Sequence, residues 1–134
     1  DEFKQMCIRQ GVDSGTVDAM VENPWQILPQ ATTSVEILAE SDGWVSDIDA
    51  LALGQILCNL GAGRTGFDTN IDHGIGAELI KGVGDKIEVG MAWIRFDINS
   101  EMAASTTEII QNSIKISNAK VEKSGRILQI ITSP

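Results

Sequence analysis

The chain has 134 residues, of which 43% are hydrophobic, and this is enough for one domain with a sizeable core. Nineteen acidic and ten basic residues give a formal net charge of -9, which disfavours nucleic acid as a partner because its phosphates would be repelled. The sequence has no apolar run of about eighteen residues and no charged leader before an apolar stretch. We therefore expect a soluble, cytoplasmic protein that does not bind membranes.

The first residues indicate a helix. Phe3, Met6 and Cys7 follow helical spacing, and Gly11 is a typical stop. Because the periodic pattern is present from the start, we expect the chain to be part of a larger protein.

A turn-rich stretch follows this helix. Pro24 and Pro29 flank Trp25 and other apolar residues, which is typical of a linker with a short apolar anchor. We predict that residues 1–31 are the last helix of a preceding domain with its linker, and that residues 32–134 form the next domain.

Two strands and a helix are predicted next. The strands Thr33–Leu38 and Trp44–Ile48 are separated by Ser-Asp-Gly, the composition of a hairpin turn. Apolar residues then recur at helical spacing from about Ala50 to Leu60, behind Asp49 as the N-cap. The helix is predicted to end at Gly61.

The second half reads as strands around another helix. Strands are predicted at 75–80 and 94–98, joined by GVGDKIEVG with tight turns at Gly84 and Gly90. We expect Asn99 or Ser100 to cap a helix. The apolar residues of that helix are Met102, Ala103, Ile109, Ile110 and Ile114. A last strand is predicted at 126–131. The fold class is therefore α+β, a small mixed sheet or strand sandwich with two helices.

The string GAGRTG at 61–66 fits GxGxxG, a spacing that holds pyrophosphate when a strand precedes it and a helix follows. Here a helix precedes it, so the partially negative end of the dipole faces the loop. We interpret Gly61 as a left-handed helix stop and Gly63 as the residue that allows the next bend.

Cysteine and histidine offer no metal site in the sequence. Cys7 and Cys58 lie far apart without metal-ligand spacing, and we expect two buried thiols. His73 has no second His or Cys nearby, so we expect a loop histidine that is hydrogen-bonded to its neighbours.

Three carboxylates cluster in the sequence between 42 and 49. Nothing in the sequence marks Asp42, Asp47 or Asp49 as buried, so we interpret them as turn and cap residues and not as an acid/base pair.

Three longer segments together resemble one family. They are SDGWVSDIDALALGQILCNLGAGR at 41–64, IDHGIGAELIKGVGDKIEVGMAWIRF at 71–96 and IIQNSIKISNAKV at 109–121. This combination resembles the C-terminal domain of the thymidine phosphorylase and pyrimidine-nucleoside phosphorylase family, which implies an α/β-hammerhead-like domain.

The resemblance implies a pentosyltransferase that reversibly phosphorolyses thymidine or another pyrimidine nucleoside to the free base and 2-deoxyribose 1-phosphate. Its implied partners are the nucleoside, inorganic phosphate as co-substrate, the protein's own N-terminal domains and a second copy in a homodimer. No cofactor is implied. In the family, the phosphate loop, of the form KxHSxGG, and the base-binding residues precede the C-terminal domain, and no such loop occurs in this chain. We therefore assign no catalytic, cofactor-binding or metal-binding residue to this chain and expect it to be inactive alone.

One loop is still of interest. The resemblance implies that Gly61, Ala62, Gly63 and Arg64 face the cleft between domains, which would give the chain a structural and domain-closing role.

Two other functions stay open at this point. The segment GDKIEVG resembles half of the motif of biotinyl and lipoyl carrier domains, although the lysine tripeptide MKM or DKA is absent. The other alternative is a small binding module that uses an exposed apolar face.

Overall fold

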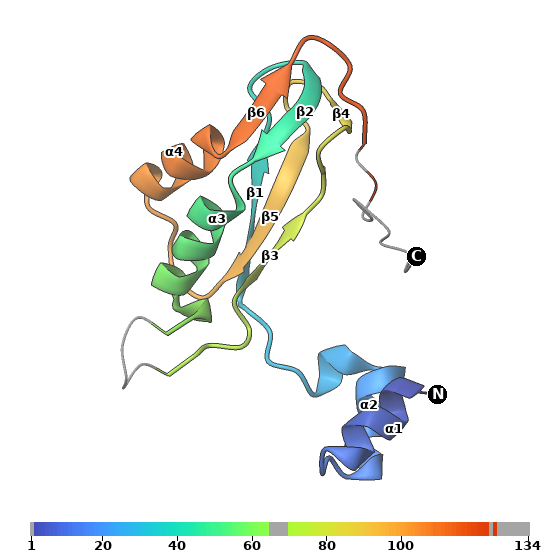
Figure 1. The fold of residues 1–134 in the computed structure, drawn as a ribbon. Coiled ribbons are helices and arrows are strands. Elements are labelled where there is room, and N and C mark those ends of the chain that lie inside the picture. The colour runs from blue at the N-terminus through green and yellow to red at the C-terminus, as the bar shows by residue number, and fades with distance from the viewer. Residues whose placement is uncertain (1, 65–69, 124, 126–134) are drawn as a thin grey trace, which may run out of the picture.

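Two small antiparallel sheets and two groups of helices make up this computed structural model, which describes residues 2–64, 70–123 and 125 (Figure 1). The described elements, in chain order, are α1 Glu2–Arg9, α2 Ser14–Glu22, η1 Pro24–Gln26, β1 Thr33–Leu38, β2 Gly43–Ile48, α3 Ala50–Leu57, η2 Cys58–Ala62, β3 Gly76–Leu79, β4 Lys86–Ile87, β5 Ala92–Ile98, α4 Ala104–Asn112 and β6 Ile114–Ser117. The predicted α+β class is confirmed. None of these helices is long and apolar enough to cross a bilayer.

The six strands form two sheets of three, in the orders β1-β5-β3 and β4-β2-β6. The predicted strands at 75–80 and 94–98 correspond to β3 and β5, which pair antiparallel as expected from their alternation. The turns at Gly84 and Gly90 are also confirmed, since both glycines have positive φ angles. The short strand β4 between them was not predicted.

The predicted hairpin between β1 and β2 is wrong, because these strands lie in different sheets. β1 pairs with β5, and β2 pairs with β4 and β6. Beyond β1 the chain stays beside the segment that leads into β5, where the Ala39 amide donates to the Met91 carbonyl at 2.8 Å. The Ser-Asp-Gly stretch then takes the chain across to the second sheet and does not turn it back.

The core lies between the sheets and the helices α3 and α4, which occupy one flank of the strands (Figure 1). Phe96 in the central strand β5 is fully buried, between Val35 on β1 and Ala77 on β3. A β-bulge interrupts the alternation of β5. The register pairs Ile94 with its partner on β1 and then skips Trp93, so both consecutive residues are buried.

The helix predictions need three corrections. Helix α2 was missed within the predicted linker, where the Asp13 side chain caps it by accepting from the Thr16 amide at 2.9 Å. The helix after β5 begins later than predicted, and neither Asn99 nor Ser100 caps it. Ile114 belongs to β6, because the chain turns at Ser113 into a strand that pairs with β2.

The helices α1 and α2 pack against each other at a distance from the sheets, and a linker joins them to β1 (Figure 1). A salt bridge of 2.6 Å between Lys4 and Asp18 connects the two helices. Gly11 has the expected positive φ, +92°, after α1. The division at residues 31 and 32 stays a prediction. The predicted strand at 126–131 lies outside the described residues.

Candidate functional site

The loop that we expected to face a cleft begins where α3 ends. α3 runs to Leu57, three residues short of the predicted end, and continues as the π-turn Cys58–Ala62. Gly61 has a φ of +115°, so the left-handed stop predicted at this position is confirmed. A Cβ on Gly61 would lie 3.3 Å from Ile75 Cδ1, so the glycine also allows close packing.

Gly63 is required for a reason that we did not predict. Its φ and ψ of −141° and 171° are extended angles that any residue can adopt, so the expected freedom to bend is wrong. A Cβ at this position would instead overlap Cys58 Sγ. Cys58 and Cys7 are both free and half-buried, so the expectation of two fully buried thiols is also wrong.

Arg64 follows these glycines and is exposed. Its side chain forms no hydrogen bond and no ion pair with another described residue. A guanidinium carries five N–H donors, so Arg64 can bind an anion or a carbonyl group without first giving up a described partner.

Asp72 holds the other side of this loop. Its amide donates to the Gly61 carbonyl at 2.9 Å, which satisfies an acceptor at the end of the helix. Its carboxylate accepts from the Gly74 amide at 2.9 Å and from Asn99 Nδ2 at 2.7 Å. These hydrogen bonds, that of Asn99 first, hold the pKa of the Asp72 carboxyl below its usual value, and the His73 charge adds to the effect.

Asn99 extends this network to the linker. Its Oδ1 accepts from the Thr32 amide at 2.8 Å, directly before β1 begins. Gly74 meets the same linker, because a Cβ there would lie 2.9 Å from the Gln30 carbonyl carbon and 3.0 Å from the Ala31 nitrogen. The glycine-rich loop and the linker from the helix pair therefore meet at one end of the sheets.

His73 is exposed in the turn beside this network. The expected hydrogen bonds to its neighbours are absent among the described residues, where its side chain makes none. No group of three or more His, Cys, Asp or Glu side chains in the described ranges is arranged to hold a metal ion.

Of the three clustered carboxylates only Asp49 acts as expected, because Asp42 lies in no turn and bonds to an amide that is 47 residues away. Asp49 caps α3 by accepting from the Ala52 amide at 2.9 Å, and Asp42 accepts from the Val89 amide in a loop at 2.7 Å. Asp47 is neither a turn nor a cap residue. It lies on β2 and forms a salt bridge of 2.7 Å with Lys115 on β6, which lowers the pKa of Asp47.

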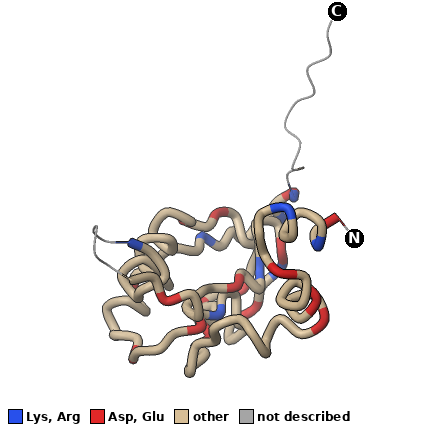
Figure 2. The backbone as a smooth tube through the Cα atoms, turned by 90° about the horizontal axis from the view of Figure 1, so that it is seen from below, with Lys and Arg blue, Asp and Glu red and all other residues tan. Residues whose placement is uncertain are grey.

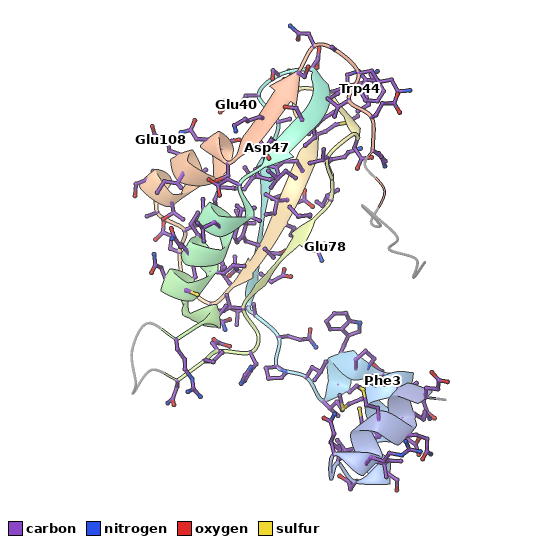
Figure 3. The ribbon with its side chains drawn as sticks, viewed as in Figure 1. Phe3, Glu40, Trp44, Asp47, Glu78 and Glu108 are labelled. Atoms are coloured by element: carbon purple, nitrogen blue, oxygen red, sulfur yellow. The ribbon has the colours of Figure 1, made fainter. Side chains whose placement is uncertain are left out.

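The basic residues of the described chain are spread over several elements, with acidic residues between them (Figure 2). Four lysines, Lys81, Lys86, Lys120 and Lys123, lie around β4, where Lys86 pairs with Glu88 and Lys123 with Asp85. Arg95 on β5, for example, donates to Glu78 at 2.6 Å. Glu78 lies on β3 (Figure 3). These two side chains line a groove of about 630 Å³ between the outer face of the first sheet and the linker around Trp25.

A comparison with protein families matches residues 44–117 to the pyrimidine nucleoside phosphorylase C-terminal domain. The chain is 38% identical over 97 residues to the thymidine phosphorylase of Homo sapiens, an alignment that covers 69% of this chain and 20% of that protein. It is 35% identical over 120 residues to the pyrimidine-nucleoside phosphorylase of Geobacillus stearothermophilus, covering 90% of this chain and 27% of that protein. The chain thus spans less than a third of the length of these curated relatives.

Proposed function

The chain belongs to the family of pyrimidine nucleoside phosphorylase C-terminal domains, and on that premise we propose that it is the C-terminal part of a cytoplasmic pyrimidine-nucleoside phosphorylase. In this reaction a phosphate oxygen bonds to the anomeric carbon of a nucleoside such as thymidine. The bond from that carbon to the base nitrogen breaks, and the base leaves with the electron pair and takes up a proton. The products are the free base and 2-deoxyribose 1-phosphate.

This chain would support the reaction without supplying its central groups. Phosphorolysis needs a positioned phosphate and stabilisation of charge on the departing base. The sequence has no KxHSxGG-like loop, and three of the four lysines that lie around β4 already pair with acidic side chains, Lys86 with Glu88, Lys120 with Glu122 and Lys123 with Asp85. We propose that the parts of the protein before this segment bind phosphate, nucleoside and a second subunit.

The role left to this domain is to contribute the loop 61–64 to the cleft between domains. The observation that supports this is the meeting of that loop with the linker at one end of the sheets, through Asp72, Asn99 and Thr32. The linker leads back to α1 and α2, so the preceding domains would lie on this side. Arg64 is exposed there and would contact a bound ligand or the opposing domain.

We expect the 134-residue chain to fold but not to release thymine from thymidine and phosphate. The complete protein should do so under the same conditions. The measurement is chromatography of thymine over time at several protein concentrations. Thymine release by the isolated chain, at a rate proportional to its concentration, would show that catalytic groups lie within it. A complete protein without phosphorolysis of any pyrimidine nucleoside would refute the proposed activity.

Replacing Arg64 with alanine in the complete protein is expected to lower kcat/KM for the nucleoside by roughly tenfold or more, the usual effect of losing a hydrogen bond from a charged group. The melting temperature should hardly change, because Arg64 is exposed and binds no other described residue. Lys120→Ala is the control, since this basic side chain is exposed and lies 6.0 Å from the ring of Trp44, at the end of the sheets away from α1 and α2 (Figure 3). Equal kcat/KM values for Arg64→Ala and its parent would contradict a role of Arg64 in turnover. The loop would then serve only to end the helix and turn the chain.

A further inference from the structure

Three segments that are distant in the sequence are joined through one aspartate. The Asp72 amide donates a hydrogen bond to the Gly61 carbonyl, at the end of the helix that leads to Arg64. The Asp72 carboxylate accepts a hydrogen bond from Asn99, which follows the end of β5. The Asn99 side chain in turn accepts one from the Thr32 amide in the linker. We call these hydrogen bonds, together with the bond from the Gly74 amide to Asp72, the Asp72 latch.

The latch has only one consistent assignment of donors and acceptors. Asn99 Nδ2 must donate, because a carboxylate oxygen of Asp72 faces it at 2.7 Å. Asn99 Oδ1 is then free to accept from the Thr32 amide at 2.8 Å. The second carboxylate oxygen of Asp72 accepts from the Gly74 amide, so each of its oxygens has a described donor. The geometry therefore depends on a carboxylate at one position and an amide at the other.

The latch also lies where the linker touches the loop region most closely. The Gly74 backbone approaches Gln30 and Ala31 so tightly that a Cβ would come within about 3 Å of them. On the other side, Gly61 packs against Ile75. A shift of the linker at Thr32 would therefore displace the turn at Asp72. The same turn is hydrogen-bonded to Gly61, at the end of the helix before Arg64.

We propose that Asp72 is a positioning residue that sets the place of Arg64 relative to the linker. The part of this inference that concerns turnover rests on the proposed function. The structural part, a coupling between Thr32 and the loop through Asn99, does not. Asp72 touches no reacting atom and acts through Arg64.

The donor pattern allows a sharp test in the complete protein. Asn99→Asp places two carboxylates face to face. In Asp72→Asn the new side chain has a single oxygen for two donors, Asn99 Nδ2 and the Gly74 amide, so one of these bonds is lost. The double variant Asp72→Asn/Asn99→Asp restores every bond with its direction reversed at the centre. The amide at position 72 then donates to the carboxylate at position 99, which still accepts from Thr32. The net charge of the double variant equals that of the parent.

The first readout is hydrogen exchange of individual amides, which does not depend on activity. In Asn99→Asp we expect the amides of Thr32 and Asp72 to exchange about tenfold faster, because repulsion between the two carboxylates displaces the acceptor of the Thr32 amide and the turn at Asp72. In the double variant their rates should return to those of the parent. The control is the Ala52 amide, which is held by a different carboxylate, that of Asp49, and should not change. Unchanged exchange at Thr32 in Asn99→Asp, or no recovery in the double variant, would overturn the latch.

The second readout is a cycle with Arg64→Ala. If Asp72 acts through Arg64, then Asp72→Asn should lower kcat/KM about as much as Arg64→Ala, and should lower it no further when Arg64 is already alanine. Full additivity of the two losses would overturn the positioning role. If Arg64→Ala alone leaves turnover unchanged, the proposed role of Arg64, and with it this positioning role, fails, while the coupling to Thr32 is still decided by exchange. If both single variants fail to fold, recovery of folding in the double variant supports the latch and its failure to fold overturns it.

Discussion

Replacing Phe96 with alanine is expected to lower the free energy of unfolding by about 3–5 kcal/mol, a large share of the total stability of an ordinary domain. The ring is fully buried on the central strand of the first sheet, with strands on both sides. Neither Val35 nor Ala77, its register partners, can fill the space that the ring would leave. Urea denaturation of variant and parent measures the difference.

The control for this substitution is Leu51→Ala. Leu51 is also a large apolar residue, but 73% of its surface is exposed on α3, so the change should stay within about 0.5 kcal/mol. Similar losses for the two variants would mean that the first sheet does not bury Phe96 against the core.

Gly43→Ala should cost about 2–5 kcal/mol, because it combines backbone strain with a steric clash. Gly43 has a φ of +152°, and a Cβ there would lie 2.5 Å from the Ser117 carbonyl oxygen and 2.7 Å from Ile116 Cγ2. Both contacts belong to β6, so the methyl group would push β6 away from β2. Thermal unfolding followed by circular dichroism provides the measurement.

Gly90→Ala separates the two causes. Its φ of +82° is also positive, but a Cβ there would meet no atom within 4 Å. We expect this control to lose only about 1–2 kcal/mol, the cost of a left-handed conformation. If Gly43→Ala proved no worse than Gly90→Ala, the close pairing of β2 and β6 at that point would be wrong.

Local patterns in the sequence predicted local structure well. The Asp49 cap, the glycine stop at Gly61 and the alternation from Ile94 to Ile98 in β5 each depend on a few neighbouring residues, and all are confirmed. The alternation predicted for β3 is wrong, because Ala77, Glu78 and Leu79 are all exposed. The hairpin failed because a turn composition shows that the chain bends but does not show which strand will be its partner. Trp93 was not assigned to the core because a bulge changes the face of a residue without any local signal.

The candidate site was predicted only in part. Glycines followed by an exposed arginine marked the loop, but the residue that holds it was not recognised. No role was predicted for Asp72, although an Asp side chain that bonds to the backbone two residues on is a usual turn feature. Its bonds to Asn99 and the Gly61 carbonyl join segments that are far apart in the sequence, and no periodicity or spacing predicts such contacts.

Because the chain crosses from one sheet to the other after β1, the domain cannot complete either sheet early in its synthesis. β1 pairs with β5 in a register that joins Thr33 to Ile98, and β2 needs β6, which follows α4. At a synthesis rate of about 5–20 residues per second, β5 emerges from the ribosome on the order of seconds after β1. During this time β1 has no partner strand. Such non-local pairing is typical of domains that fold slowly, in milliseconds to seconds. While the ribosome is still adding residues, the apolar side of β1 is therefore without its native cover, and chaperones would have the longest access to the chain at this stage.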